Sequence, residues 1–87
     1  MPENDFTRQV LVVDDDASVR GGIAQVLLKR DLAVRTAADG SQALALLAEE
    51  PAAIVLLDVK LPGPDGVEVL KTIRRDYPDT EVIMITG

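Results

Sequence analysis

Cysteine and histidine are both absent from this 87-residue sequence. Without cysteine the chain can form neither a disulfide framework nor a thiolate metal site. Without histidine it lacks the commonest general base and the commonest zinc ligand. A metal ion bound by these side chains would therefore be a hard cation that prefers oxygen ligands.

Positive charge and long apolar runs are also scarce. The formal net charge of −6 argues against direct nucleic-acid binding by this segment. No apolar stretch is long enough to span a bilayer, and the acidic residues 1–5 do not resemble a signal peptide. We therefore expect a cytoplasmic protein without membrane contact. The length allows at most one domain, and 47% apolar residues suffice for a core.

The most informative stretch is residues 54–66. Four apolar residues end abruptly at Asp58, and a loop with two prolines and two glycines follows. An apolar run between turn signals predicts a buried strand. Because an unpaired buried carboxylate is costly, Asp58 must reach water, a cation or hydrogen-bond donors at the strand end. The simpler alternative is an aspartate that only caps the loop backbone.

Strands and helices alternate along the rest of the chain. Asp16 is the expected N-cap of the first helix, and Ser41 that of the second. Val19, Ile23, Val26 and Leu27 are spaced so that they fall on one face of the first helix. The alternation indicates a parallel sheet with helices on both faces. We expect strands at 9–13, 32–37, 53–57 and 81–86, and helices at 17–30, 41–50 and 66–76.

The apolarity of each strand predicts its place in the sheet. Residues 32–37 are the least apolar and should form an edge, whereas 9–13 and 53–57 should lie inside. The order 2-1-3-4, numbered along the chain, satisfies this. Ligands bind such sheets beyond the carboxyl ends of the strands, where the order reverses. The acids 14–16 and Asp58 should therefore converge.

The last strand does not fit an outermost position. Residues 82–85 are apolar on both faces, and an exposed apolar edge invites pairing with another chain. We therefore expect a further strand and helices after Gly87, so that residues 1–87 would be the N-terminal part of a single, incomplete domain. We also expect this chain to self-associate through the exposed edge of the fourth strand.

Clustered carboxylates repel one another unless a cation joins them, and Mg²⁺ suits an all-oxygen site. Asp15 and Asp58 would be direct ligands, Asp14 would orient a metal-bound water, and the Lys60 backbone carbonyl could add a ligand. A carboxylate beside Mg²⁺ can attack phosphorus and form an aspartyl phosphate. Thr86 would then offer its hydroxyl to a phosphoryl oxygen.

Simpler interpretations remain open for these residues. Asp14 and Asp15 could be turn formers, and Asp16 could serve only as a helix cap. Thr86 could be an ordinary strand-end residue. The side chain of Lys60 could simply be solvated.

Three segments together resemble the receiver domain of two-component response regulators. They are residues 11–16, 57–66 and 82–87, in the order and near the spacing of that family. The ending Met84-Ile85-Thr86-Gly87 is most similar to receivers of the nitrogen-regulation, sigma-54-dependent activator type, which precede an ATPase domain and a DNA-binding domain. The resemblance implies a flavodoxin-like sheet of order 2-1-3-4-5. This chain would lack strand 5, helices 4 and 5 and the family's invariant lysine.

The resemblance also implies a function. Asp58 would accept a phosphoryl group from a sensor histidine kinase, with Mg²⁺ held by Asp15, Asp58 and the Lys60 carbonyl. Asp14 would complete the acidic pocket, and Thr86 would be the switch residue for a downstream, transcriptional output. Such a domain is a phosphoacceptor rather than an enzyme. Phosphorylation and output would be impaired in the truncated form.

Two other functions fit parts of the sequence. Residues 14–19 also resemble the first motif of haloacid-dehalogenase-type phosphatases, in which Asp14 would be the nucleophile and Asp16 the acid/base. That family does not call for Asp58 and its loop. The second alternative is a receiver-like interaction module that is never phosphorylated.

Overall fold

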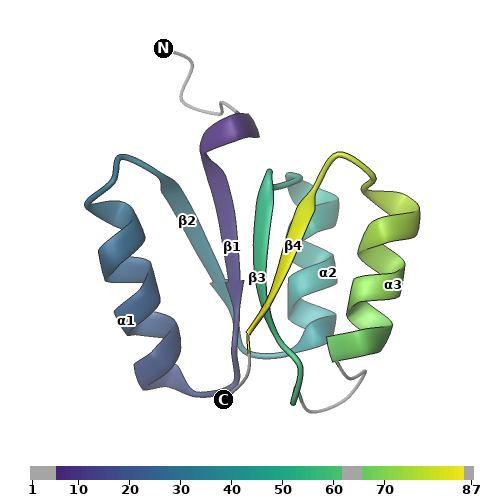
Figure 1. Ribbon diagram of the computed structural model, residues 1–87, viewed down its shortest axis with the longest axis horizontal. Helices are drawn as coiled ribbons and strands as arrows, with labels where there is room; N and C mark the ends of the chain where they lie inside the picture. The colour runs from purple at the N-terminus through teal and green to yellow at the C-terminus, as the bar shows by residue number, and fades with distance from the viewer. Residues whose placement is uncertain (1–5, 62–65, 86–87) are drawn as a thin grey trace.

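The computed structural model describes residues 6–61 and 66–85, and these carry a single sheet of four parallel strands. The order is β2-β1-β3-β4, as the sequence predicts (Figure 1). Each strand lies within a residue or two of its expected position. The strands are β1 (Gln9–Val13), β2 (Ala33–Ala37), β3 (Ile54–Asp58) and β4 (Glu81–Ile85).

The helices divide unequally between the two faces of the sheet. α1 (Ala17–Leu28) lies on one side, and α2 (Gly40–Glu49) and α3 (Gly66–Asp76) lie on the other (Figure 1). A short 3-10 turn, η1 (Phe6–Arg8), precedes β1. No helix in the described part of the chain is long and apolar enough to cross a membrane.

The helix caps test the local predictions. Asp16 caps α1 as expected, because its Oδ1 accepts hydrogen bonds from the backbone N–H groups of Ser18 and Val19. The expected cap of α2, Ser41, is wrong. Asp39 takes that place and accepts from the N–H of Gln42 at 2.8 Å. Both residues are good caps, and the helix starts one residue earlier than the sequence suggested.

The core lies between the sheet and the α2/α3 side. Alternate residues of β1 and β3 point to this side, and α2 and α3 cover them with apolar side chains of their own. Fully burying one such side chain stabilises the fold by roughly 1.5–3 kcal/mol. The largest buried members are Leu11, Leu47, Leu57, Ile73, Val13, Val55 and Val69.

The α1 side is only partly covered. Val19 and Val26, on the apolar face of α1, have exposed fractions of 43% and 57%. Ile23 and Leu27 are half-buried, and no residue of α1 is fully buried. One side of the apolar face of α1 packs against the sheet. No second helix among the described residues covers the other side of that face.

Candidate functional site

The register of the two central strands determines the positions of the acidic residues. β1 and β3 pair in parallel with Val13 beside Leu57, so Asp14 and Asp58 leave the sheet next to each other. One carboxylate oxygen from each of Asp14, Asp15 and Asp58 lies within 4.8 Å of the others. The strand order therefore brings together the three acids that the sequence singled out.

Backbone N–H groups hold the two buried carboxylates in place. Asp14 and Asp58 each expose only 5% of their surface, whereas Asp15 is exposed. Asp14 Oδ1 accepts from the N–H of Asp16 at 2.9 Å, and Asp58 Oδ1 accepts from the N–H of Lys60 at 2.9 Å. These are the turn interactions of the simpler interpretation. A carboxylate accepts up to about four hydrogen bonds, so both groups keep capacity for a further ligand.

Asp16 is not a member of the cluster. Its Oδ1 is engaged with two N–H groups at the start of α1. Among the three consecutive acids, the structure therefore separates a helix cap, Asp16, from two residues that face Asp58. The phosphatase alternative would need Asp16 to act on the group bound at Asp14, and its place as the cap disfavours this.

The cluster carries substantial repulsion. Two unit charges 4.8 Å apart repel by about 3 kcal/mol at an effective dielectric constant near 20. One cation lies close by: Arg20 donates from Nη1 to the backbone oxygen of Asp14 at 2.8 Å. Sequence analysis missed Arg20. Its position six residues after Asp14, in the first turns of α1, is the signal that could have indicated it.

A hollow of about 570 Å³ opens above the acids. Its floor is acidic, and its sides are partly apolar because α1 and β4 contribute Val19, Ile23 and Ile85. Lys60 also lines it with an exposed side chain. The hollow is thus open to a small anionic group, but the acids would repel that group unless a cation were present.

The end of β4 adjoins the same site. Asp58 pairs with Ile85, and the backbone oxygen of Ile85 accepts from the N–H of Val59 at 3.2 Å. Thr86, the expected switch residue, lies outside the described residues, as do residues 62–65 of the loop.

Gly66 is a site residue that sequence analysis took only for a turn. A Cβ atom there would lie 2.6 Å from the backbone oxygen of Asp58 and 2.7 Å from the Cα of Val59. Real Cβ atoms do not approach backbone so closely. The first residue of α3 must therefore be glycine for α3 to begin this close to the end of β3. Nothing in the local sequence pattern reveals this contact, because it joins segments across a loop.

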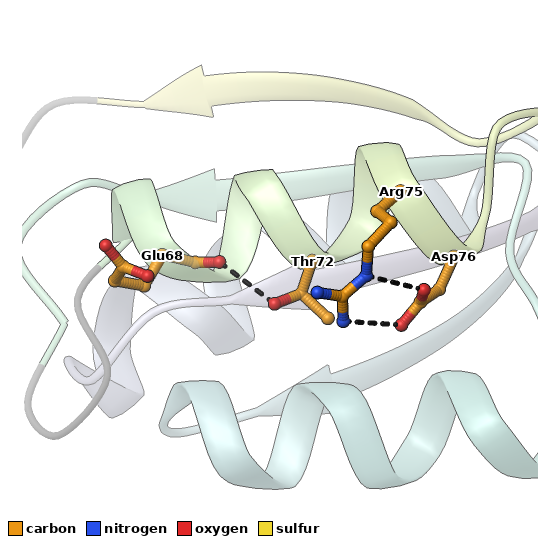
Figure 2. Close-up of polar contacts among 4 residues, drawn as sticks. All are labelled: Glu68, Thr72, Arg75 and Asp76. Atoms are coloured by element: carbon orange, nitrogen blue, oxygen red, sulfur yellow. Dashed lines mark hydrogen bonds and ion pairs between the residues drawn. The ribbon is translucent and has the colours of Figure 1, made fainter.

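A second hollow, of about 280 Å³, lies near the start of β4 and is lined by Phe6, Tyr77 and neighbouring residues. One of its acids, Asp76, is held by Arg75 through hydrogen bonds of 2.9 and 3.1 Å (Figure 2). Among the described residues, only Asp14, Asp15 and Asp58 gather at metal-binding distance. The group of three carboxylates, rather than the presence of a hollow, therefore identifies the site.

Comparison with known proteins agrees with this geometry. A family model described as the response regulator receiver domain matches residues 10–87. An NtrX-like response regulator of Rickettsia bellii is 41% identical over 80 residues, which cover 90% of this chain and 17% of that protein. The nitrogen assimilation regulatory protein NtrX of Azorhizobium caulinodans is 38% identical over 84 residues, covering 94% and 18%. The chain thus spans less than a fifth of these curated relatives.

Solved structures share the fold. A CheY-like receiver domain protein from Methanospirillum hungatei superposes with a TM-score of 0.89 at 32% identity, covering 93% of this chain and 65% of that one. The response regulator TrrA from Thermotoga maritima, solved in complex with Mg²⁺-BeF, gives 0.86 at 31% identity, covering 92% and 70%. The expected flavodoxin-like receiver fold is confirmed.

Proposed function

This chain belongs to the response regulator receiver domain family, and on that premise we propose that Asp58 is its phosphoacceptor. Receiver domains are generally phosphoacceptors rather than enzymes. The observation that carries the proposal is the position of Asp58: its buried carboxylate ends a central strand and shares one hollow with Asp14 and Asp15.

The donor set fits Mg²⁺. Carboxylate oxygens from three residues lie within 4.8 Å of one another, and Mg²⁺ is typically bound by one or two carboxylates while it keeps several waters. Asp15 and Asp58 would bind it directly, with the Lys60 backbone carbonyl, and Asp14 would act through a water. When bound, the ion supplies positive charge that offsets the charge of the phosphoryl group.

We propose different tasks for the two oxygens of Asp58. The N–H of Lys60 binds Oδ1, which supports Oδ2 as the atom that would attack phosphorus. With a phosphohistidine donor, the new bond joins Oδ2 to phosphorus, and the phosphorus–nitrogen bond breaks. The leaving imidazole nitrogen keeps the electron pair and takes up a proton. Because Asp58 is fixed by its turn and its strand, little motion is needed to reach the reacting geometry.

Thr86 is the proposed switch residue. In the β3–β4 ladder Asp58 pairs with Ile85, the residue that precedes Thr86 in the sequence. This pairing supports Thr86 as the residue whose hydroxyl would bond a phosphoryl group on Asp58. Hydrogen bonding to that group would draw the end of β4 toward the site and pass the signal on.

The partners follow from the family. Receiver domains of response regulators interact with sensor histidine kinases, and we propose such a kinase as the donor for this chain. We also propose a cytoplasmic location, a downstream transcriptional output, and self-association through the β4 edge.

The test is chemical labelling with acetyl phosphate and Mg²⁺, followed by mass spectrometry of the intact chain and its peptides. We expect one phosphoryl group, located on Asp58, and no label on Asp58→Asn. Asp39→Asn is the matched control, since it removes a helix-capping carboxylate outside the site and should still be labelled. A label on Asp14 would instead support the phosphatase alternative, and no label on any residue would support the interaction module.

A further inference from the structure

The turn between β1 and α1 carries Asp15, whose side chain lacks the support that the other two acids have. Its carboxylate is exposed and accepts no hydrogen bond from any residue that the structure describes. The carboxylates of Asp14 and Asp58, in contrast, are buried, and each accepts from a backbone N–H group. The direction of the Asp15 side chain therefore depends on how firmly its backbone is held.

Arg20 holds the backbone on both sides of Asp15. Its Nη1 donates to the carbonyl oxygen of Asp14 at 2.8 Å, and its backbone N–H donates to the carbonyl oxygen of Asp16 at 2.9 Å. The second bond is the first of α1, and most residues could form it, whereas the first requires this side chain. The Asp14 carbonyl belongs to the planar peptide unit that leads into Asp15. Holding that carbonyl therefore restricts the backbone of Asp15 as well.

The Arg20 side chain supplies a donor where the sheet ends. Asp14 donates its N–H to the oxygen of Ala37 at 3.1 Å. In a parallel ladder the carbonyl of the same residue points toward the same neighbouring strand. That strand, β2, ends at Ala37, and the next N–H group, that of Ala38, is bound to Oε1 of Gln42. The guanidinium thus takes the place of a ladder donor and prolongs the order of β1 into the turn.

The charge of Arg20 does not occupy the acids of the cluster. In the described part of the chain Arg20 forms no ion pair with a carboxylate, and its guanidinium bonds to a backbone oxygen instead. The oxygens of Asp14, Asp15 and Asp58 that lie within 4.8 Å of one another are therefore not blocked by this cation. A side chain that steadies the turn in this way leaves the ligand positions open for a metal ion.

We propose that Arg20 is a positioning residue for the Mg²⁺ site: it holds the turn that directs the Asp15 carboxylate toward the ion, and it does not contact the ion itself. This inference deepens the proposed function and rests on its metal site. Removing an outer contact that orients a metal ligand typically lowers metal affinity about tenfold or more. A purely electrostatic role predicts the opposite sign, because a positive charge near the site opposes the binding of a second cation.

The test compares substitutions of Arg20 with a matched control. Arg20→Met keeps an apolar stem and removes the guanidinium, whereas Arg20→Lys keeps the charge and a hydrogen-bond donor. Arg30→Met removes the same charge from an exposed residue beyond the other end of α1. In NMR titrations with Mg²⁺ we expect the dissociation constant to rise about tenfold in Arg20→Met, less than about threefold in Arg20→Lys and less than about twofold in Arg30→Met.

Two further measurements separate positioning from a general effect on the fold. In acetyl phosphate labelling of Arg20→Met, the Mg²⁺ concentration for half-maximal labelling should rise about tenfold, while the rate at saturating Mg²⁺ should change less than about twofold. The reason is that the strand and the turn that hold Asp58 are unchanged. Without metal, the Asp16 amide, which bonds to Asp14 Oδ1, should exchange its hydrogen at least about threefold faster in Arg20→Met and at the wild-type rate in Arg30→Met.

The outcomes that would overturn the proposal are specific. They are an unchanged or increased Mg²⁺ affinity in Arg20→Met, an equal loss of affinity in Arg30→Met, or an unchanged Asp16 exchange rate without metal. Urea denaturation establishes that each variant is folded, and Arg20→Gln, which is neutral and shorter, gives the same comparison if Arg20→Met is not. Failure to label Asp58 in the wild type would overturn the proposed function instead, while the NMR titrations would still test Arg20.

Discussion

The inner strand β1 and the outer strand β4 carry similar apolar residues but are buried to very different extents, and the two faces of the sheet differ as well. β1 (sequence QVLVV) is buried at every position, whereas β4 (sequence EVIMI) is buried at none. On the α2/α3 side, side chains such as Leu57 and Ile73 are fully enclosed. On the α1 side Val26 and Ile83 are more than half exposed. A strand's apolar composition thus states what it could bury, and its place in the sheet decides what it does bury.

The sharpest test of this difference is truncation of one large side chain on each face. Leu11→Ala removes a fully buried side chain and should lower the free energy of unfolding by about 2–5 kcal/mol, because it leaves a cavity among packed neighbours. Ile83→Ala, at 51% exposure, should lower it by less than about 1 kcal/mol. Urea denaturation measures both, at concentrations where the chain is monomeric. Equal losses would mean that the α1 side is covered in solution.

Replacing a glycine in close contact with other backbone and replacing a glycine on the exposed surface of α1 give a second comparison. Gly66→Ala should destabilise the fold by about 1–3 kcal/mol, because its Cβ would meet the Asp58 and Val59 backbone at less than 3 Å. It should also weaken Mg²⁺-dependent labelling of Asp58. Gly22→Ala on α1 has nothing within 4 Å of the new methyl group and should stabilise the chain by about 0.5–1 kcal/mol. Thermal unfolding and acetyl phosphate labelling distinguish the two variants.

The acidic cluster at the carboxyl ends of β1 and β3 brings three carboxylates within 4.8 Å of one another. Asp15→Asn should raise the free energy of unfolding without metal by about 1 kcal/mol, since it removes part of the repulsion within the cluster. The wild-type chain should gain stability on adding Mg²⁺, by about 2.7 kcal/mol at a hundred times the dissociation constant, and Asp15→Asn should gain much less. Thermal shift measurements with and without Mg²⁺ check this. A variant that still responded to Mg²⁺ like the wild type would remove Asp15 from the site.

The smallest effect should come from the outer surface of α3. The hydrogen bond from Arg75 lowers the pKa of Asp76, and desolvation of the carboxylate opposes this (Figure 2). A lowered pKa in the fold adds stability above the ordinary carboxyl pKa, which is lost as pH falls through the lower folded value. Both side chains are exposed, so Arg75→Gln should return the Asp76 pKa toward its ordinary value without a measurable change in stability. NMR titration of Asp76 in the wild type and in Arg75→Gln measures the shift.

Much of the fold could be predicted from local pattern. The alternation of strands and helices, the sheet order and the cap at Asp16 follow from backbone geometry and short-range hydrogen bonding. The same reasoning placed Asp14 and Asp58 at the ends of neighbouring strands. It failed for the α2 cap, where Asp39 and Ser41 are equally suitable residues, and it did not indicate how exposed Val19 and Val26 are.

The sequence by itself determined which side chains could form a core and which acids stood at the ends of strands, because periodicity and strand length are properties of short segments. Only the tertiary structure decided that Asp14, Asp15 and Asp58 meet within 4.8 Å and that Gly66 must lack a side chain. The physical reason is that each of these depends on the distance between segments far apart in the chain. Such distances are set by packing rather than by any residue's own conformational preference.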